Sequence, residues 1–97
     1  MAFAILTFDK VGHKHVRDEH RAAHYAHLEK YMDRLIVSGG LRDDADEEFI
    51  GGMIVFDTNS IDEVYNFVDT DPFTIAGLFD RVEIVRWRPA FFDRKRV

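Results

Sequence analysis

Five histidines fall within fifteen residues of this 97-residue chain, and the rest of the sequence has none. They are His13, His15, His20, His24 and His27. Histidine exchanges its proton closer to neutral pH than any other side chain, so it is the usual proton carrier in proteins and a common metal ligand. On a helix, residues 20, 24 and 27 stand at i, i+4 and i+7 and project from one face. The pattern therefore indicates proton-transfer chemistry, a metal site, or a helix face that merely meets solvent. We expect His20 and His27 at the rim of any pocket or in solvent.

The metal site is the less favoured of the two chemical interpretations. His20 and His24 have the i, i+4 spacing of zinc ligands on a helix, and His13 with His15 would supply two more ligands. However, residue 21 is arginine, whereas helical zinc motifs of this spacing carry glutamate beside the first histidine. The chain also has no cysteine, which excludes thiolate ligands, disulfides and a cysteine nucleophile. We therefore assign no metal ligand and expect no cofactor, and a His-rich metal-binding protein is kept as the weakest alternative.

The composition is that of a folded chain. Hydrophobic residues make up 46% of the sequence, and nine are phenylalanine. The formal net charge of -5 disfavours nucleic-acid binding, which depends on Lys and Arg neutralising phosphates. The basic run at residues 94–96 is too short to change this and is typical of a solvated tail. With no signal-peptide pattern and no apolar stretch of roughly 18 residues, we expect one cytoplasmic domain over residues 1–97 that does not bind a membrane.

The elements that must position the histidines alternate between strand and helix. Phe3–Phe8 is a short apolar run that predicts a strand. Apolar residues then recur at three- and four-residue spacing, which predicts a helix over Val16–Ile36, ended by the Ser-Gly-Gly sequence behind it. A second strand is expected to start at Gly40–Arg42. The acidic residues 43–48 predict a solvated hairpin loop, and Phe49–Phe56 predicts the third strand.

The second half of the chain repeats the helix–strand order. Ser60 and Glu63 form a capping box at the start of a helix. An Asp-Pro pair at residues 71–72 is an ordinary start for a further helical turn, expected to run through Leu78. Val82–Arg88 predicts the fourth strand. The order β-α-β-β-α-β predicts an α+β, ferredoxin-like fold: an antiparallel four-stranded sheet with two helices on one face.

Both faces of this sheet are predicted to be apolar. Within the first strand, Leu6 and Phe8 point to one face and Phe3 and Ile5 to the other, and the third strand alternates apolar residues in the same way. A single layer of helices covers one face only. The other face therefore needs a partner, and we expect a homodimer that packs sheet against sheet. A dimer and a higher oligomer such as a dimer of dimers both satisfy this requirement.

Cationic and aromatic side chains suggest a site for a small anion. Arg17 and Arg21 lie one turn apart on the predicted helix and could present a guanidinium to a carboxylate-like group. An ion pair of Arg21 with Asp18 or Glu29 is the alternative. Phe73, together with Phe79 and Trp87, could form the wall of an aromatic pocket. These aromatic side chains suit core packing equally well.

Three segments of the chain resemble the YCII-related (YciI-like) family of small bacterial proteins. The first is Arg21–Leu28 (RAAHYAHL), and the second is Leu35–Gly40 (LIVSGG). The third and most specific is Asp69–Leu78 (DTDPFTIAGL), which is similar to the family's Asp-x-Asp-Pro-aromatic-x-x-Ala-Gly signature. The chain departs from the family pattern at Ala22 and Gly40, where proline is common.

The resemblance implies a dimeric α+β barrel made of two ferredoxin-like subunits. It also implies a pocket that holds a histidine–aspartate pair, at His24 and Asp71 in this sequence. One relative in the wider family is a dehydrochlorinase of a chlorinated hydroxyhydroquinone. Muconolactone isomerases and cofactor-free monooxygenases share the barrel plan. By this resemblance His24 and Asp71 are the candidate catalytic residues. Their residue types make Arg21 and Phe73 the candidate substrate-binding residues.

A histidine oriented by a carboxylate can remove a proton next to a carbonyl or an enol and return it elsewhere. Isomerisation and elimination of HCl both require such a step. The favoured hypothesis is a cofactor-free lyase or isomerase that acts on a small cyclic or aromatic-derived anion. The alternative is a dimeric protein that binds a small ligand, or serves as an accessory, without catalysis.

Overall fold

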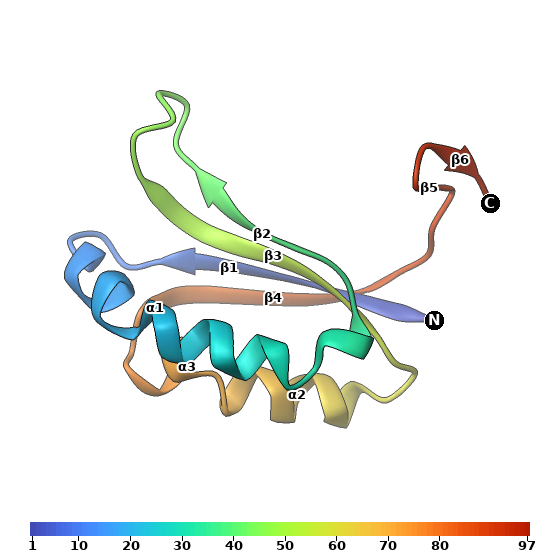
Figure 1. Cartoon of the computed structure of the whole chain (residues 1–97), viewed down its shortest axis with the longest axis horizontal. Coiled ribbons are helices and arrows are strands. Elements are labelled where there is room, and N and C mark those ends of the chain that lie inside the picture. Colours follow the sequence, from blue (N-terminus) through green and yellow to red (C-terminus); the bar gives the residue numbers. More distant parts are fainter.

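The fold is a single antiparallel sheet with its helices on one side (Figure 1). The computed structural model describes all residues from 1 to 97. The four long strands are ordered β2-β3-β1-β4, and every neighbouring pair is antiparallel. This is the βαββαβ, ferredoxin-like arrangement that the sequence predicts. The elements are β1 (Ala2–Asp9), α1 (Lys14–Glu29), the 3₁₀ turn η1 (Met32–Arg34), β2 (Leu35–Arg42), β3 (Phe49–Asp57), α2 (Ile61–Asp69), α3 (Pro72–Ile75), β4 (Phe79–Trp87), β5 (Phe91–Phe92) and β6 (Lys95–Arg96).

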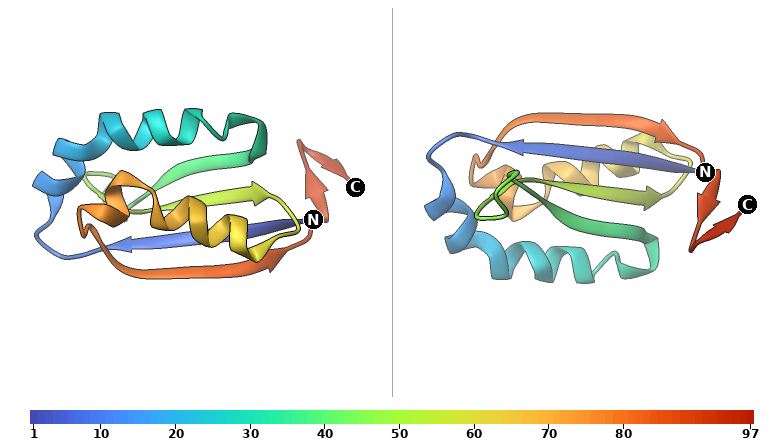
Figure 2. Two further views of the ribbon diagram at one scale, coloured as in Figure 1. Left: turned by 90° about the horizontal axis from the view of Figure 1, so that it is seen from below. Right: turned by 90° about the horizontal axis from the view of Figure 1, so that it is seen from above.

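The hydrophobic core lies between the sheet and the two long helices, which run side by side across one face (Figure 2). Alternation along β1 and β3 directs every second side chain toward the helices. Helix α1 contributes Leu28, and α2 contributes three residues at helical spacing. No helix combines the length and apolar composition of a membrane-crossing segment. The core residues are Phe3, Ile5, Leu28, Ile54, Phe56, Val64, Phe67 and Val68.

Helix α1 is shorter than the sequence predicts. It ends at Glu29, seven residues before the expected end at Ile36, and β2 begins at Leu35 rather than at Gly40. The apolar run Leu35–Val37 pairs with β3, so these residues belong to the sheet and not to the helix. The Ser-Gly-Gly sequence expected to end the helix lies inside β2. The expectation failed because the turn that ends α1, residues 30–34, contains neither glycine nor proline.

Three further differences concern α3, β4 and the carboxy-terminal residues. Helix α3 ends at Ile75, three residues before the expected end at Leu78, and Gly77 follows it with a positive φ of 76°. Strand β4 begins at Phe79, three residues earlier than expected, because residues 79–81 continue its pairing with β1. Residues expected to form a solvated tail instead form a small hairpin in which β5 pairs with β6. This hairpin is not part of the four-stranded sheet.

The N-cap that the sequence predicts for α2 is present, but the reciprocal contact of a capping box is not. The Ser60 backbone N–H donates to the Thr58 hydroxyl at 3.1 Å and not to Glu63. The Ser60 hydroxyl accepts a hydrogen bond from the backbone N–H of Glu63 at 3.3 Å. The Glu63 carboxylate accepts hydrogen bonds from the Thr58 hydroxyl and from Arg34 of η1. These two contacts hold the pKa of Glu63 below its ordinary value, and Glu63 in turn raises the pKa of Arg34. The cap therefore also ties the start of α2 to the turn that precedes β2.

Small residues occupy one helix-facing row of the sheet. In this row Gly40 of β2 lies opposite Gly52 of β3, and Gly52 lies opposite Thr7 of β1. The Phe49 ring packs directly on Gly40, where a Cβ would lie 2.4 Å from it, and the space beside this row forms part of a cavity. The neighbouring Gly51 permits close strand contact, because a Cβ there would lie 2.0 Å from the carbonyl oxygen of Thr7. Gly51 is therefore the position at which the sheet requires glycine for the close approach of two backbones.

We predict that Gly51→Ala lowers the free energy of unfolding by about 1–3 kcal/mol, because its methyl group would force β1 and β3 apart. Gly39→Ala is the matched control, since a Cβ at Gly39 meets no atom within 4 Å. Urea denaturation of both variants measures the difference. Equal stabilities would show that the sheet absorbs the extra methyl group without cost.

Candidate active site

A cavity of about 140 Å³ lies between α1 and the row of small residues in the sheet. The sheet forms its floor, with Thr7, the glycines of β2 and β3, and Ile54. Helix α1 contributes a stripe of residues at helical spacing, which are Arg17, Arg21, His24 and Leu28. The start of α3 supplies Asp71 and Phe73, and β3 supplies Phe49 at its first residue. A cavity of roughly 150 Å³ accommodates benzene, so this one has the size of a single ring.

His24 and Asp71 meet at one end of this cavity, although 47 positions separate them in the chain. The His24 Nδ1 lies 2.8 Å from Oδ1 and 3.0 Å from Oδ2 of Asp71. Their side chains are 13% and 6% exposed. A carboxylate only accepts hydrogen bonds, so Nδ1 carries the proton. The opposite nitrogen, Nε2, has no hydrogen-bond partner in the protein and is left as the acceptor of the neutral ring.

Asp71 also starts α3. Its Oδ1 accepts a hydrogen bond from the backbone N–H of Phe73 at 2.9 Å, and proline follows at the first helical position. The ring of Phe73 stacks on the His24 imidazole, with the centroids 4.1 Å apart and the planes inclined by 15°. The sequence suggests Asp71 as a helix start, and the resemblance implies its contact with His24. The Asp71 carboxylate does both.

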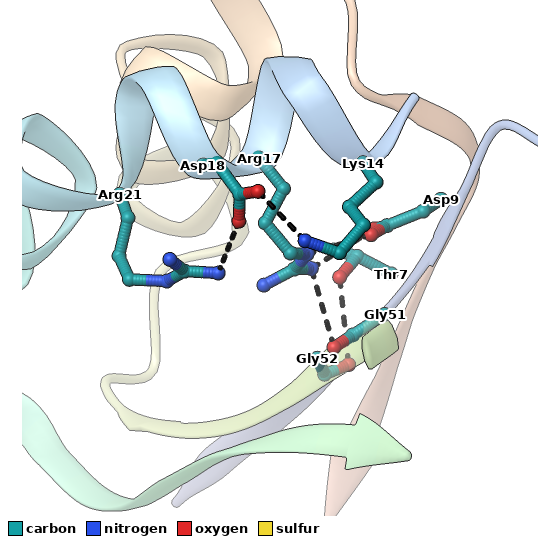
Figure 3. Close-up of polar contacts among 8 residues, drawn as sticks. All are labelled: Thr7, Asp9, Lys14, Arg17, Asp18, Arg21, Gly51 and Gly52. Carbon is teal, nitrogen blue, oxygen red and sulfur yellow. Dashed lines mark hydrogen bonds and ion pairs between the residues drawn. The ribbon is translucent and has the colours of Figure 1, made fainter. Parts of the chain in front are cut away.

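A second buried pair joins Arg17 and Asp9 next to the first, and sequence reasoning did not assign it. Arg17 donates from Nε to Asp9 at 2.7 Å and from Nη2 to the other carboxylate oxygen at 3.0 Å (Figure 3). It also donates to the carbonyl oxygen of Gly51 at 3.3 Å. The Arg17 and Asp9 side chains are 11% and 9% exposed. This guanidinium is already neutralised, so it anchors α1 to the sheet and does not offer a free charge.

The aromatic walls of the cavity are packed between charged groups. The Arg17 guanidinium carbon lies 4.9 Å from the centroid of Phe73, whose ring also stacks on His24. The same guanidinium lies 5.4 Å from the centroid of Phe49, and Arg42 stacks on Phe49 at 4.4 Å. These cation–π contacts hold both rings at the cavity. Phe79 also lines the cavity and meets Phe73 edge-on, whereas Trp87 does not line it.

Arg21 lies at the mouth of the cavity, where its side chain is 36% exposed. It donates a hydrogen bond to Asp18 at 3.0 Å, and Lys14 donates to the other oxygen of that carboxylate at 2.8 Å (Figure 3). Lys14 first and Arg21 second hold the pKa of Asp18 below its ordinary value. Two cations therefore share one anion at the mouth, and the group carries a net positive charge. Arg21 both forms an ion pair and lines the cavity, so the two roles considered for it coexist.

A wider cleft of about 630 Å³ lies outside the mouth. The β1–α1 loop and the β2–β3 hairpin form its sides, and it shares Arg17, Arg21 and Phe49 with the inner cavity. Glu47 and Glu48 of the hairpin lie on its rim. A ligand passing through this cleft meets Arg21 before it reaches His24.

The other histidines do not join the cavity. His27 was expected at the rim or in solvent, but it is 7% exposed: its Nε2 lies 2.9 Å from the carbonyl oxygen of Phe67 and its ring stacks on Phe67. The hydrogen bond to the backbone carbonyl offsets the loss of hydration when this polar side chain is buried. His20 is partly exposed and lies 3.9 Å from Glu19. No group of three histidine or acidic side chains converges to hold a metal ion.

Comparison with known proteins identifies the family of this chain. The sequence model of the YCII-related domain matches residues 1–88. The chain belongs to the YCII family. No protein with a curated description matches it.

A solved structure of a YCII-family enzyme is similar to this chain. It is the 5-chloro-2-hydroxyhydroquinone dehydrochlorinase TftG from Burkholderia phenoliruptrix AC1100, solved in complex with 2,5-dihydroxybenzoquinone. The two chains are 36% identical, and the match covers 91% of this chain and 94% of TftG with a TM-score of 0.87. The fold of this YCII chain is therefore that of an enzyme that binds a small quinone.

We predict that Asp9→Asn destabilises the protein by about 3 kcal/mol, because it leaves the Arg17 guanidinium buried without its counter-charge. Asp18→Asn is the control, since it removes the same charge from an exposed cluster and should change stability little. Denaturant unfolding of both variants gives the comparison. If Asp9→Asn is as stable as Asp18→Asn, the Arg17–Asp9 pair does not anchor α1.

Proposed function

We propose that this protein is a small lyase-type enzyme whose His24 transfers a proton within a bound ring compound. Asp71 orients His24, and the substrate is a monocyclic, hydroxylated ring that carries negative charge. Phe73 forms one wall of the ring site and Arg21 attracts the anion. The reaction class is elimination or isomerisation by acid–base catalysis, which requires a positioned proton carrier and no electron acceptor.

The observation that carries the proposal is the state of the His24 ring. Its Nδ1 is held by Asp71, and its Nε2 is unpartnered beside a cavity the size of one ring. A carboxylate in this position fixes the tautomer and stabilises the imidazolium that forms when Nε2 accepts a proton. A histidine that serves packing alone does not need a buried carboxylate as its partner. His27 is an example, because its ring bonds only to the backbone carbonyl of Phe67.

Elimination of HCl from a chlorinated hydroxyhydroquinone illustrates the step. The ring first tautomerises: one hydroxyl proton is transferred to the chlorine-bearing carbon, which becomes tetrahedral while the hydroxyl becomes a carbonyl. His24 Nε2 then removes a second hydroxyl proton, whose electron pair forms the other carbonyl and shifts the neighbouring ring double bond. Chloride leaves with the electrons of the carbon–chlorine bond, which gives a quinone and HCl. The proton on Nε2 then passes to solvent through the mouth of the cavity. TftG is named for this kind of elimination, and its bound quinone supports a planar hydroxylated ring as the ligand class.

Charge at the mouth supports an anionic substrate. The two buried pairs, His24–Asp71 and Arg17–Asp9, leave no free cation inside the cavity. Arg21 is 36% exposed and shares Asp18 with Lys14, so it can exchange Asp18 for an anion of the substrate. Arginine presents paired donors that suit a carboxylate or an enolate. Arg21 therefore favours entry of a negatively charged ring without placing an uncompensated charge in the core.

We predict that His24→Gln lowers kcat by about 10²- to 10⁴-fold for release of chloride from 5-chloro-2-hydroxyhydroquinone or a related ring. Asp71→Asn should also lower kcat, although asparagine remains a good helix N-cap and the fold should be kept. His20→Gln is the control, because His20 does not line the cavity. Chloride release and thermal unfolding are measured on the same samples. Full activity of folded His24→Gln, with turnover in the wild type, would refute the mechanism; tight quinone binding without any turnover would favour a binding protein.

We also propose that the protein is a homodimer joined through the sheet face that carries no helix. A row of apolar side chains crosses this face: Val37, Val55, Ala4 and Val85 are consecutive partners across the four strands. Val55 is buried by its neighbours, but Val37 and Val85 are 46% and 54% exposed in the protomer. A second copy would remove this row from water.

We predict that Val85→Lys converts the dimer to a monomer without unfolding it, because the lysine is tolerated at an exposed position but not in an apolar interface. Val11→Lys is the matched control, since Val11 is 98% exposed in a loop. Sedimentation velocity gives the mass of each variant. A monomeric wild type, or a dimer that persists in Val85→Lys, would contradict the proposed interface.

A further inference from the structure

The last ten residues form an arm that leaves the body of the protomer (Figure 1). After β4, residues 88–97 continue beyond the ends of the strands and rise on the side of the sheet away from the helices, where β5 and β6 pair in a short hairpin. Two residues with positive φ, Asp93 and Arg94, form its turn. Two strands are marginally stable in water by themselves. Phe91 and Phe92 are 72% and 46% exposed, so the arm presents aromatic surface that nothing in its own protomer covers.

The arm is strongly basic. Residues 88–97 contain four basic side chains and one acidic one, and none of them makes an ion pair or a side-chain hydrogen bond within the protomer. Such a concentration of unpaired positive charge contrasts with the chain as a whole, whose formal net charge is -5. The basic residues of the arm are Arg88, Arg94, Lys95 and Arg96.

The complementary surface is the loop between β2 and β3. Residues 43–48 contain five acidic side chains and no basic one. Asp46 pairs with Arg42, and Asp43 accepts hydrogen bonds from the backbone N–H groups of Glu47 and Glu48. The side chains of Glu47 and Glu48 have no partner in the protomer. The loop therefore has a fixed backbone and free carboxylates.

The two charged segments cannot meet within one protomer. Figure 1 shows the β2–β3 loop and the arm at opposite ends of the molecule, and both rise on the side of the sheet away from the helices. The view from above in Figure 2 also separates them along the length of the sheet. A second copy seated on the bare sheet face would lie between the acidic loop and the basic arm.

Symmetry determines which ends of two copies meet. A two-fold axis that lies between the sheets and across the strands places the arm of each protomer at the acidic loop of the other. A two-fold axis along the strands would instead bring arm to arm and loop to loop, which joins like charges. Charge complementarity favours the first arrangement and disfavours the second.

We propose that the arm, residues 88–97, docks on the acidic β2–β3 loop, residues 43–48, of a second copy of this chain. The contact occurs twice in the dimer, with Phe91 and Phe92 covered and Lys95 and Arg96 facing the partner's Glu47 and Glu48. This inference rests on the proposed dimer and adds its orientation. Because Glu47 and Glu48 line the outer cleft, the arm of one protomer forms part of the entrance to the other's site.

A charge exchange tests the contact. Lys95→Glu/Arg96→Glu and, separately, Glu47→Lys/Glu48→Lys should each raise the dimer dissociation constant by about tenfold or more, because like charges then meet at both contacts. The four substitutions combined in one chain should restore the dissociation constant to within a few-fold of wild type. None of these positions is one of the positive-φ turn residues. Sedimentation equilibrium at low and high salt measures the constants, and salt should weaken the wild-type dimer.

Asp62→Lys/Asp69→Lys is the control for the reversed loop, since it makes the same charge change at exposed positions of α2 on the helix side. It should leave the dissociation constant unchanged. If the wild type dimerises and the combined variant stays as weak as the separate reversals, the arm contact is wrong and the sheet-face dimer stands. A wild type that is monomeric at all accessible concentrations overturns both.

Discussion

The candidate site depends on the hydrogen bonds that the carboxylate of Asp71 accepts. One oxygen accepts a hydrogen bond from the Phe73 N–H and so starts α3, while both oxygens lie within hydrogen-bond distance of the His24 Nδ1. The chain direction at α3, the stacking of Phe73 and the tautomer of His24 therefore follow from one group. A buried carboxylate loses its hydrogen bonds to water. Here the His24 Nδ1 of α1 and the Phe73 N–H of α3 replace them.

The fold was predictable where local patterns agree with the final packing. The alternation of β1 and the cap at Ser60 each lead to the observed element, because side-chain burial and local hydrogen bonding favour the same conformation there. The end of α1 was not predictable in this way. Leu35 and Ile36 continue the helical spacing, and only their pairing with β3, a contact distant in the sequence, makes this segment a strand.

The candidate site was predictable to different degrees. Family resemblance indicated His24 and Asp71 as a pair, but their separation of 47 positions means that only the folded structure can bring them to 2.8 Å. The pairing of Asp9 with Arg17 was missed because an aspartate directly after a strand is usual in a turn. The close spacing of the two residues across a strand–helix junction was the available signal. The expectation for His27 was wrong: it was predicted at the rim or in solvent, but it is buried beside the core.

The floor of the cavity is made by backbone and small side chains of the sheet, whereas its mouth is made by long side chains of α1. The permitted size of a ligand is therefore set by hydrogen-bonded strands of the sheet, in which Gly40 and Gly52 are paired. The permitted charge depends on Arg21 and its neighbours, which are exposed and can be exchanged with little effect on packing. Ring size and charge can thus diverge independently: relatives with the same sheet can come to accept different ions without any rebuilding of the core.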